Sequence, residues 1–331
     1  MAWLSGYNYR KSVTLSRASG AVSNYQMKLL VGESSGATGE DVDCGGHCLS
    51  TFNDIRFTTS DGTTMLDYWI ESVTGTTPNQ LATIWIEFDY IGTSATTFYM
   101  YYGKADATAG SNGSNTFLFF DDFARENSDT VGNGWTESVD VFSIENGTLK
   151  NINPSNSDAE RRCYKSFSSW GSSFCFEART KLPELVASHS VVTELVNNGN
   201  QRMVLGIEKT SVRYFLNTWV SIDTNSGDWI ILGSIFDSVN TKVAYAVNRT
   251  IKASNVSLAS ASGYQNTIEI TTYWRSSLSY VDWVLVRQYL ATEPAWGSWG
   301  AEEYDVSFTT ESAVASATMD GITPIESTTE S

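Results

Sequence analysis

The stretch DIRFTTSDGTTMLDYWIESV, residues 54–73, decides the fold class. Apolar and polar side chains alternate on both sides of Asp61-Gly62, a residue pair preferred in tight turns between antiparallel strands. The stretch therefore predicts a β-hairpin. Other runs alternate in the same way, and no helical periodicity separates them: 11–16, 26–31, 82–88 and 96–103. The first hundred residues are therefore expected to form a β-sandwich.

The second half of the chain also has sequence patterns that are typical of β-strands and hairpins. Residues 142–151 (FSIENGTLKN) predict a hairpin with an Asn-Gly turn, and residues 242–254 (KVAYAVNRTIKAS) predict another. Residues 279–290 (SYVDWVLVRQYL) are apolar on both faces and predict a buried strand. We therefore expect an all-β protein with two β-sandwich domains in tandem and an extended C-terminal tail: 1–118, 119–291 and 292–331.

Composition and charge exclude several classes of protein. The 331 residues are 41% hydrophobic and 13% aromatic, which is enough for well-filled cores in two domains. A net charge of −16 repels phosphate backbones, so we expect no nucleic-acid partner. No run of apolar residues is long enough to span a bilayer, so we expect no membrane insertion. Met1 leads almost directly into strand-like sequence, so no signal peptide is expected.

The four cysteines form two local pairs. Cys44 and Cys48 lie in a Gly-rich loop, DCGGHC. Cys163 and Cys175 are symmetric about Ser169, where a hairpin would turn, and residues so placed face each other. We expect a disulfide within each pair. Free structural thiols, or metal or redox chemistry, are the alternatives.

Four segments in order resemble the domain family DUF2341, over residues 1–118: YNYRKSVTLS (7–16), NDIRFTTSDGTTMLDYWIES (53–72), TIWIEF (83–88) and TTFYMYYGKADATAGSNGSNTFLFFDDF (96–123). This family has no assigned activity. It recurs in surface and virion-type proteins beside carbohydrate-binding-like sandwiches. The resemblance therefore implies an architecture and no particular reaction.

Four later landmarks resemble the concanavalin A-like lectin/glucanase sandwich of family-16 glycoside hydrolases: FDDF (120–123), ENGTLK (145–150), FEARTKLPE (176–184) and VDWVLVRQY (281–289). The resemblance implies that residues 119–291 form a concanavalin A-like jelly roll. Those hydrolases carry two glutamates bracketing an aspartate on one strand, in the pattern E-x-D-x-(x)-E. Here the strand offers Glu194 with no aspartate and no second glutamate in register, and the pattern occurs nowhere else. We therefore expect no enzymatic activity.

The same resemblance implies a structural calcium ion. In the hydrolase frame, the opening acidic strand, the early hairpin glycine and the aspartate of the last strand converge on such an ion. The matching positions are Asp121 or Asp122, the backbone carbonyl of Gly147, and Asp282. The alternative is that Asp122 caps the strand and Asp282 bonds to backbone, with no ion present.

Lectin-like sandwiches bind sugars with aromatic side chains and polar neighbours. Trp219, Trp229, Tyr273 and Trp274 are candidates by residue type, because each lies beside Asn, Asp, Thr or Arg. The alternative is that each is a core aromatic.

The expected function follows from this architecture. We expect a non-catalytic structural protein of a virion or extracellular surface, such as a tail, fibre or capsid decoration, that adheres to host glycans. A secreted or cell-surface carbohydrate-binding protein is the alternative, and a polysaccharide-cleaving enzyme is a third reading. Expected partners are other copies of the chain, other virion or surface proteins, and cell-surface glycans. In the acidic, Ser/Thr-rich tail, Trp296 and Trp299 are expected to lie on the second domain, and the rest to be a linker or a docking arm.

Overall fold

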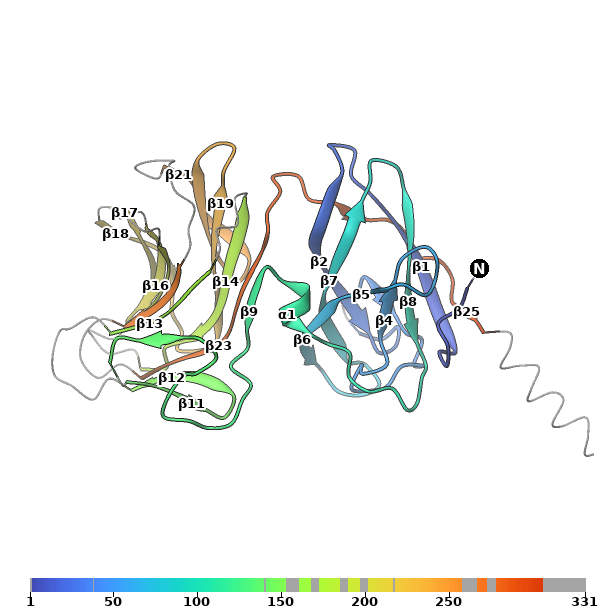
Figure 1. Ribbon diagram of the computed structural model, residues 1–331, viewed down its shortest axis with the longest axis horizontal. Helices are drawn as coiled ribbons and strands as arrows, with labels where there is room; N and C mark the ends of the chain where they lie inside the picture. The colour runs from blue at the N-terminus through green and yellow to red at the C-terminus, as the bar shows by residue number, and fades with distance from the viewer. Residues whose placement is uncertain are drawn as a thin grey trace, which may run out of the picture. The chain divides into compact units, whose positions relative to one another are not determined.

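The computed structural model describes residues 2–305 except 38, 140, 153–160, 168–172, 185–189, 197–201, 217, 258–266 and 273–277. The chain forms two compact units, drawn in Figure 1. Within the described residues, unit 1 comprises 2–23, 27–112 and 294–305, and unit 2 comprises 24–26 and 113–293. The described part of the chain contains no helix with the length and apolar character that crossing a bilayer requires.

This division differs from the predicted domain bounds. The first boundary lies between residues 112 and 113, ahead of the predicted position at 118. Residues 294–305, predicted to be part of a separate tail, belong to unit 1. The all-β prediction itself is confirmed, since the described residues contain one α-helix, α1 (Gly113–Thr116), which is a single turn.

Unit 1 is a sandwich of two sheets. One sheet has the strand order β24-β1-β8-β4-β5, with β25 also paired to β1, and the other has the order β3-β2-β7-β6. Phe88 of one sheet meets Phe98 of the other with ring centroids 4.8 Å apart, so the two sheets share an apolar core. The strands of the first sheet are β1 (Tyr9–Ser16), β4 (Arg56–Thr58), β5 (Met65–Leu66), β8 (Thr96–Tyr102), β24 (Ala295–Trp296) and β25 (Glu303–Tyr304). Those of the second are β2 (Val22–Gly32), β3 (Val42–Asp43), β6 (Tyr68–Thr74) and β7 (Leu81–Ile91).

The hairpin predicted around Asp61-Gly62 is present. β4 pairs with β5 in antiparallel register, and the Asp61 carboxylate accepts hydrogen bonds from the backbone amides of Thr63 and Thr64, each 2.8 Å. Gly62 has a φ of +83°, which favours glycine. The residues after the turn form two strands in different sheets. β5 ends at Leu66 in the first sheet, and β6 lies in the facing sheet.

Residues 294–305 form a strap along the outer edge of β1. The strap donates three backbone hydrogen bonds of 2.7–3.1 Å to this edge. The amides of Gly297 and Gly300 donate to carbonyls of β1, and the amide of Asp305 donates to the carbonyl of Asn8, the residue before β1. A Cβ atom at Gly297 would lie 2.6 Å from the Thr14 carbonyl oxygen, so this close approach requires glycine. Hydrogen bonding along the strap covers an edge that would otherwise be open to another chain.

Two glutamates anchor the strap. The Glu303 carboxylate accepts hydrogen bonds from the guanidinium of Arg10, with Oε2 at 2.8 Å from Nε and 2.6 Å from Nη2. The Glu302 carboxylate accepts a hydrogen bond of 2.7 Å from the Tyr102 hydroxyl and lies 3.1 Å from Nδ1 of His47. The indole nitrogen of Trp296 donates to the Lys28 carbonyl in unit 1, so the prediction that Trp296 lies on the second domain is wrong.

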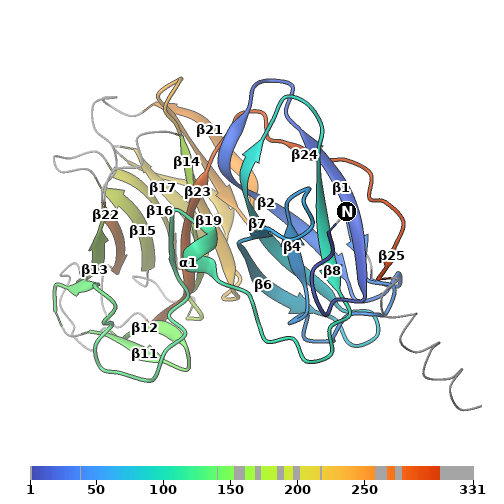
Figure 2. The same cartoon turned by 45° about the vertical axis from the view of Figure 1, so that its right-hand side comes forward.

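Unit 2 is a sandwich of two larger antiparallel sheets, so the predicted second β-sandwich is present. The seven-stranded sheet has the order β10-β13-β22-β15-β16-β17-β18, and Figure 2 labels several of its strands. Its strands are β10 (Thr136–Glu137), β13 (Arg161–Ser166), β15 (Ser190–Val196), β16 (Arg202–Glu208), β17 (Ser211–Leu216), β18 (Thr218–Thr224) and β22 (Thr267–Thr272).

The eight-stranded sheet has the order β11-β12-β23-β14-β19-β20-β21, with β9 also paired to β23. The predicted buried strand is its centre, since β23 pairs with β12, β14 and β9. Its strands are β9 (Phe119–Asp121), β11 (Phe142–Glu145), β12 (Thr148–Ile152), β14 (Phe174–Lys181), β19 (Ile230–Asp237), β20 (Lys242–Val247), β21 (Thr250–Ser257) and β23 (Leu278–Gln288).

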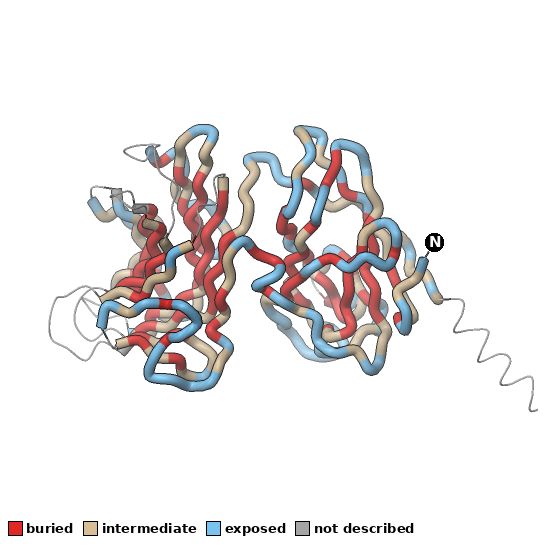
Figure 3. Tube along the Cα trace, viewed as in Figure 1, coloured by how far each residue is buried: buried red, intermediate tan, exposed pale blue. Residues whose placement is uncertain are grey.

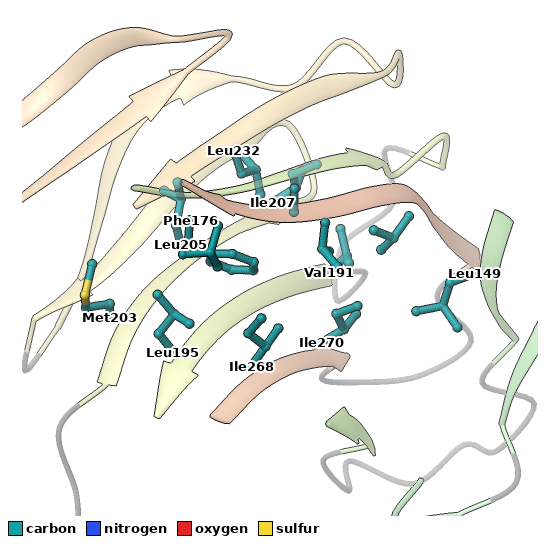
Figure 4. Close-up of a cluster of buried hydrophobic side chains, with 14 of the residues drawn as sticks. Leu149, Phe176, Val191, Leu195, Met203, Leu205, Ile207, Leu232, Ile268 and Ile270 are labelled. Atoms are coloured by element: carbon teal, nitrogen blue, oxygen red, sulfur yellow. The ribbon is translucent and has the colours of Figure 1, made fainter. Parts of the chain in front are cut away.

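The core of unit 2 lies between these sheets. Alternate residues point inward, for example Leu195 on β15 and Ile268 on β22, as Figure 4 shows. Tyr214 and Tyr245 stack across the sandwich with ring centroids 4.7 Å apart. Buried residues follow the strands of each unit in Figure 3.

The predicted disulfides are absent, because all four cysteines are free thiols. Cys163 and Cys175 are not hairpin partners: β13 pairs with β10 and β22, whereas β14 pairs with β19 and β23 of the opposite sheet. Cys163 points into the core, and Cys175 lies beside Glu177 on the other side of its sheet. Burial raises the pKa of Cys175 to about 12, which keeps this thiol protonated at neutral pH. Cys44 and Cys48 are also thiols, and burial raises the pKa of Cys44.

Glu87 on β7 makes the stability of unit 1 depend on pH. Burial, with the nearby charges of Asp67 and Asp89, raises its pKa to about 7. The folded state therefore holds a proton that the unfolded state releases at lower pH, so stability falls as pH rises from about 4.5 to about 7. Replacing Glu87 with Gln should raise the free energy of unfolding by about 1 kcal/mol at pH 8, since water screens this partly exposed group, and by almost nothing at pH 4.5. Thermal unfolding at both pH values measures this, and an equal gain at both would contradict it.

Candidate functional site

The outer face of the seven-stranded sheet is the side opposite the core. Because side chains alternate along a strand, the core residues Val191 and Leu195 leave Ser190, Val192 and Glu194 on the outer face. The same alternation on the neighbouring strands adds these residues: Val204, Gly206 and Glu208 on β16, Arg213 and Phe215 on β17, and Glu269 and Thr271 on β22.

A cavity of about 300 Å³ lies on this face. Its inner part is formed by buried residues, including Glu194 with none of its surface exposed. A Cβ atom added at Gly206 would lie 2.8 Å from the Val192 side chain, so glycine allows these strands to pack as they do. The cavity is lined by Ser190, Val192, Glu194, Val204, Gly206, Ile207, Glu208, Arg213, Phe215 and Trp219.

An aromatic pair lies at one end of the cavity. Phe215 and Trp219 are directly opposite each other on β17 and β18, with ring centroids 5.4 Å apart and an edge-to-face geometry. Phe215 is 39% exposed, unlike the apolar residues of the core. The Arg213 guanidinium lies 5.7 Å from the Trp219 ring and also contacts the Glu208 carboxylate. The site thus combines an accessible aromatic surface with charged groups held in place by each other.

Two of the four predicted ligand aromatics, Trp219 and Trp229, lie in the part of the chain that the structure describes, and they lie on or beside different sheets. Trp219 lines the cavity. Trp229 precedes β19 of the opposite sheet, where the Arg179 guanidinium covers it at 4.8 Å from the ring centroid. Tyr273 and Trp274 lie outside the described residues.

The acidic residue expected to open a calcium site, Asp121, has a different role. Its Oδ1 accepts hydrogen bonds from the Phe123 amide and from Arg125, both 2.8 Å. Its Oδ2 accepts from Asn133 at 2.9 Å and from the Trp135 indole at 2.7 Å. Burial raises the pKa of Asp121, but the hydrogen bonds from Arg125 and Trp135 outweigh it and hold the pKa below its ordinary value. The Arg125 guanidinium thus already balances the charge of this carboxylate.

Two other expected calcium ligands also contact protein groups. The Asp282 carboxylate contacts the guanidinium of Arg179, and Asp122 accepts a hydrogen bond of 3.1 Å from the Ala124 amide. Gly147 lies in the turn between β11 and β12 with a φ of +70°. Across the described residues, no three His, Cys, Asp or Glu side chains group closely enough to hold a metal ion. A calcium ion held by Asp121 or Asp122, the Gly147 carbonyl and Asp282 remains a proposal.

Several residues of the cavity escaped the sequence analysis. Glu194 was noticed only as a glutamate without a partner on its own strand, whereas β22 places Glu269 directly opposite it. Glu208, Arg213 and Phe215 occupy outer-face positions of a β-hairpin, GIEKTSVRYFL, whose alternation is visible in the sequence. What the sequence does not contain is the order of strands that brings β22 beside β15.

A family model matches part of the chain. The domain of unknown function DUF2341 matches residues 51–138, which confirms the resemblance seen in the sequence and shows that the matched region continues into unit 2. A search of curated proteins finds no match.

Several solved structures resemble the chain at low identity. A β-1,3-glucanase from Mycobacterium marinum has 13% identity and a TM-score of 0.43, covering 52% of this chain and 99% of its own. The β-glucanase of Bacillus licheniformis has 10% identity and a TM-score of 0.38, covering 52% and 98%. A structure from work on endo-acting O-glycanases of the human gut microbiota has 10% identity and a TM-score of 0.43, covering 53% and 100%. These likenesses concern the fold and not the activity.

Proposed function

We propose that the protein binds carbohydrate in the cavity on the outer face of the seven-stranded sheet and uses this binding for adhesion. The observation that supports the proposal most is the aromatic pair of exposed Phe215 and half-buried Trp219, beside a cavity of about 300 Å³ with polar groups in its wall. A sugar ring has an apolar face that stacks on an aromatic ring, and hydroxyl groups at its edge that bond to carboxylates and guanidinium groups. Both kinds of group are present within one cavity.

The location of the protein and the partners it meets there are also part of the proposal. We infer a non-catalytic surface protein, of a virion or of a cell, that meets glycans and neighbouring protein subunits. Detection of the protein on purified particles or on intact cells with an antibody tests the setting, and its recovery only from the interior of cells would contradict it.

Replacing Trp219 with alanine is expected to weaken glycan binding about tenfold or more, because stacking and apolar burial of an aromatic ring are lost. Retention of the purified protein on a panel of cell-surface polysaccharides measures the effect. The supernatant is assayed for reducing sugar, since released sugar would show an enzyme where none is expected.

Trp229 provides a matched control for this experiment. It is also a partly buried tryptophan in contact with a guanidinium, but it lies with the opposite sheet. Replacing Trp229 with alanine should leave retention unchanged. Equal losses for the two variants, or no retention of the unaltered protein on any polysaccharide, would reject the cavity as a carbohydrate site.

A further inference from the structure

An ion pair lies in the lining of the cavity, between Glu208 on β16 and Arg213 on β17. Arg213 is directly opposite Gly206, so Glu208 is its diagonal neighbour on the facing strand, and both side chains point away from the core. Solvent reaches both charged residues, since 38% of the Glu208 side chain and 26% of the Arg213 side chain are exposed. A ligand in the cavity can therefore touch both groups.

The strand that carries Arg213 is held in a fixed orientation. Val212 and Tyr214, on either side of Arg213, pack in the core, where the Tyr214 ring stacks on Tyr245 with centroids 4.7 Å apart. Their packing turns Arg213 to the outer face, where its guanidinium lies 5.7 Å from the centroid of the Trp219 ring. The ion pair is thus held next to the aromatic surface on which a sugar ring would stack.

The ion pair uses only part of its hydrogen-bonding capacity. The hydrogen bond between the two side chains runs from Nη1 of Arg213 to Oε2 of Glu208. Among the described residues, the other carboxylate oxygen, Oε1, and the other terminal nitrogen, Nη2, have no hydrogen-bond partner. A carboxylate accepts at both oxygens, and a guanidinium donates from all three nitrogens. The pair therefore offers a ligand one acceptor and one donor close together.

We propose that Glu208 and Arg213 recognise two hydroxyl groups on neighbouring carbons of a sugar ring. This inference rests on the proposed carbohydrate binding at the same cavity. One hydroxyl donates to the carboxylate and the other accepts from the guanidinium, and hydrogen bonds to charged groups are stronger than those between neutral groups. A sugar that lacks one of the two hydroxyls leaves a charged group of the protein without a partner, and a site of this kind rejects it.

The linkage of a polysaccharide decides whether it meets this condition. A pyranose unit inside a β-1,4-linked chain keeps adjacent free hydroxyls on its second and third carbons. Inside a β-1,3-linked chain, the oxygen of the third carbon is part of a glycosidic bond, so the free hydroxyls of the second and fourth carbons are not adjacent. Both chains are neutral and have the same composition. The geometry of the pair therefore favours β-1,4-linked over β-1,3-linked chains.

The test compares the two linkages for one sugar at a time. The probes are long chains of glucan, galactan and xylan, each in the β-1,4-linked and the β-1,3-linked form, coupled to beads at equal sugar density. For each sugar that retains the unaltered protein, we expect the β-1,4-linked form to bind at least about tenfold more tightly. Binding isotherms on the beads measure this ratio, and the comparison needs no protein variant.

A double variant then assigns the preference to the ion pair. Glu208→Ala with Arg213→Ala removes both charges and leaves the net charge unchanged, so the preference for one linkage should disappear. The matched control is the ion pair of Glu145 and Lys150, which has the same five-residue spacing across the β11–β12 hairpin of the other sheet. Replacing both of these residues with alanine should leave the linkage preference as it is.

The outcomes separate this inference from the proposed function. Equal binding of the two linkages by the unaltered protein would overturn the recognition of adjacent hydroxyls and leave carbohydrate binding in place. A preference that survives in the Glu208→Ala, Arg213→Ala variant would also overturn it. Absence of binding to every chain would reject the proposed function itself. If both proposals hold, Trp219→Ala weakens binding to both linkages, and only the double variant of the cavity pair abolishes the preference.

Discussion

Replacing Asp121 with alanine is expected to lower the free energy of unfolding of unit 2 by about 3–5 kcal/mol. The side chain is buried and satisfies donors from Phe123, Arg125, Asn133 and Trp135. Its removal leaves the Trp135 indole and the Arg125 guanidinium without their acceptor in a partly dry environment. The hydrogen bond from the Phe123 amide is also lost. The backbone of Phe123 has a φ of +52°, a conformation that residues other than glycine adopt with strain.

The adjacent residue is the control. Asp122 accepts one hydrogen bond, from the Ala124 amide, at an exposed site, so its replacement by alanine should cost no more than about 1 kcal/mol. Chemical denaturation of the two variants, followed by Trp fluorescence, gives both values. Comparable losses for the two positions would show that Asp121 is not the organising carboxylate of this segment.

Removing the strap by ending the chain after Glu293 is expected to unfold unit 1 or to lower its free energy of unfolding by about 5 kcal/mol. The truncation removes the carboxylate of Glu303 from the buried guanidinium of Arg10, which then lies among Trp3 and Tyr99 without its anion. It also uncovers the edge of β1, so the truncated chain should aggregate more readily.

A second truncation, after Asp305, keeps every described contact of the strap and is the matched control. Calorimetry of the two truncated chains should show the loss only in the shorter one, and size-exclusion chromatography should show larger species only there. An unchanged unit 1 in the chain that ends at Glu293 would mean that the strap is dispensable.

The sequence was a reliable guide wherever the signal was local. Alternation of apolar residues and the Asp61-Gly62 turn predicted strands and hairpins that the structure contains, because side-chain direction along a strand follows a period of two. The resemblance to DUF2341 and the two-sandwich architecture were likewise visible in short segments. Where local symmetry was used to infer contact, as for Cys163 and Cys175, the prediction was wrong, because the strands beside them pair elsewhere.

What the sequence by itself determined is the all-β class, the strands and turns with a clear local pattern, and the presence of Trp219 as a candidate ligand residue. Only the tertiary structure decided which strands lie side by side. Glu269 lies opposite Glu194 although it is 75 positions further along the chain. Glu303 binds Arg10, which is 293 positions away in the sequence. The physical reason is that strand pairing is set by the burial of apolar surface over a whole sheet, and a run of alternating residues carries no information about its neighbour.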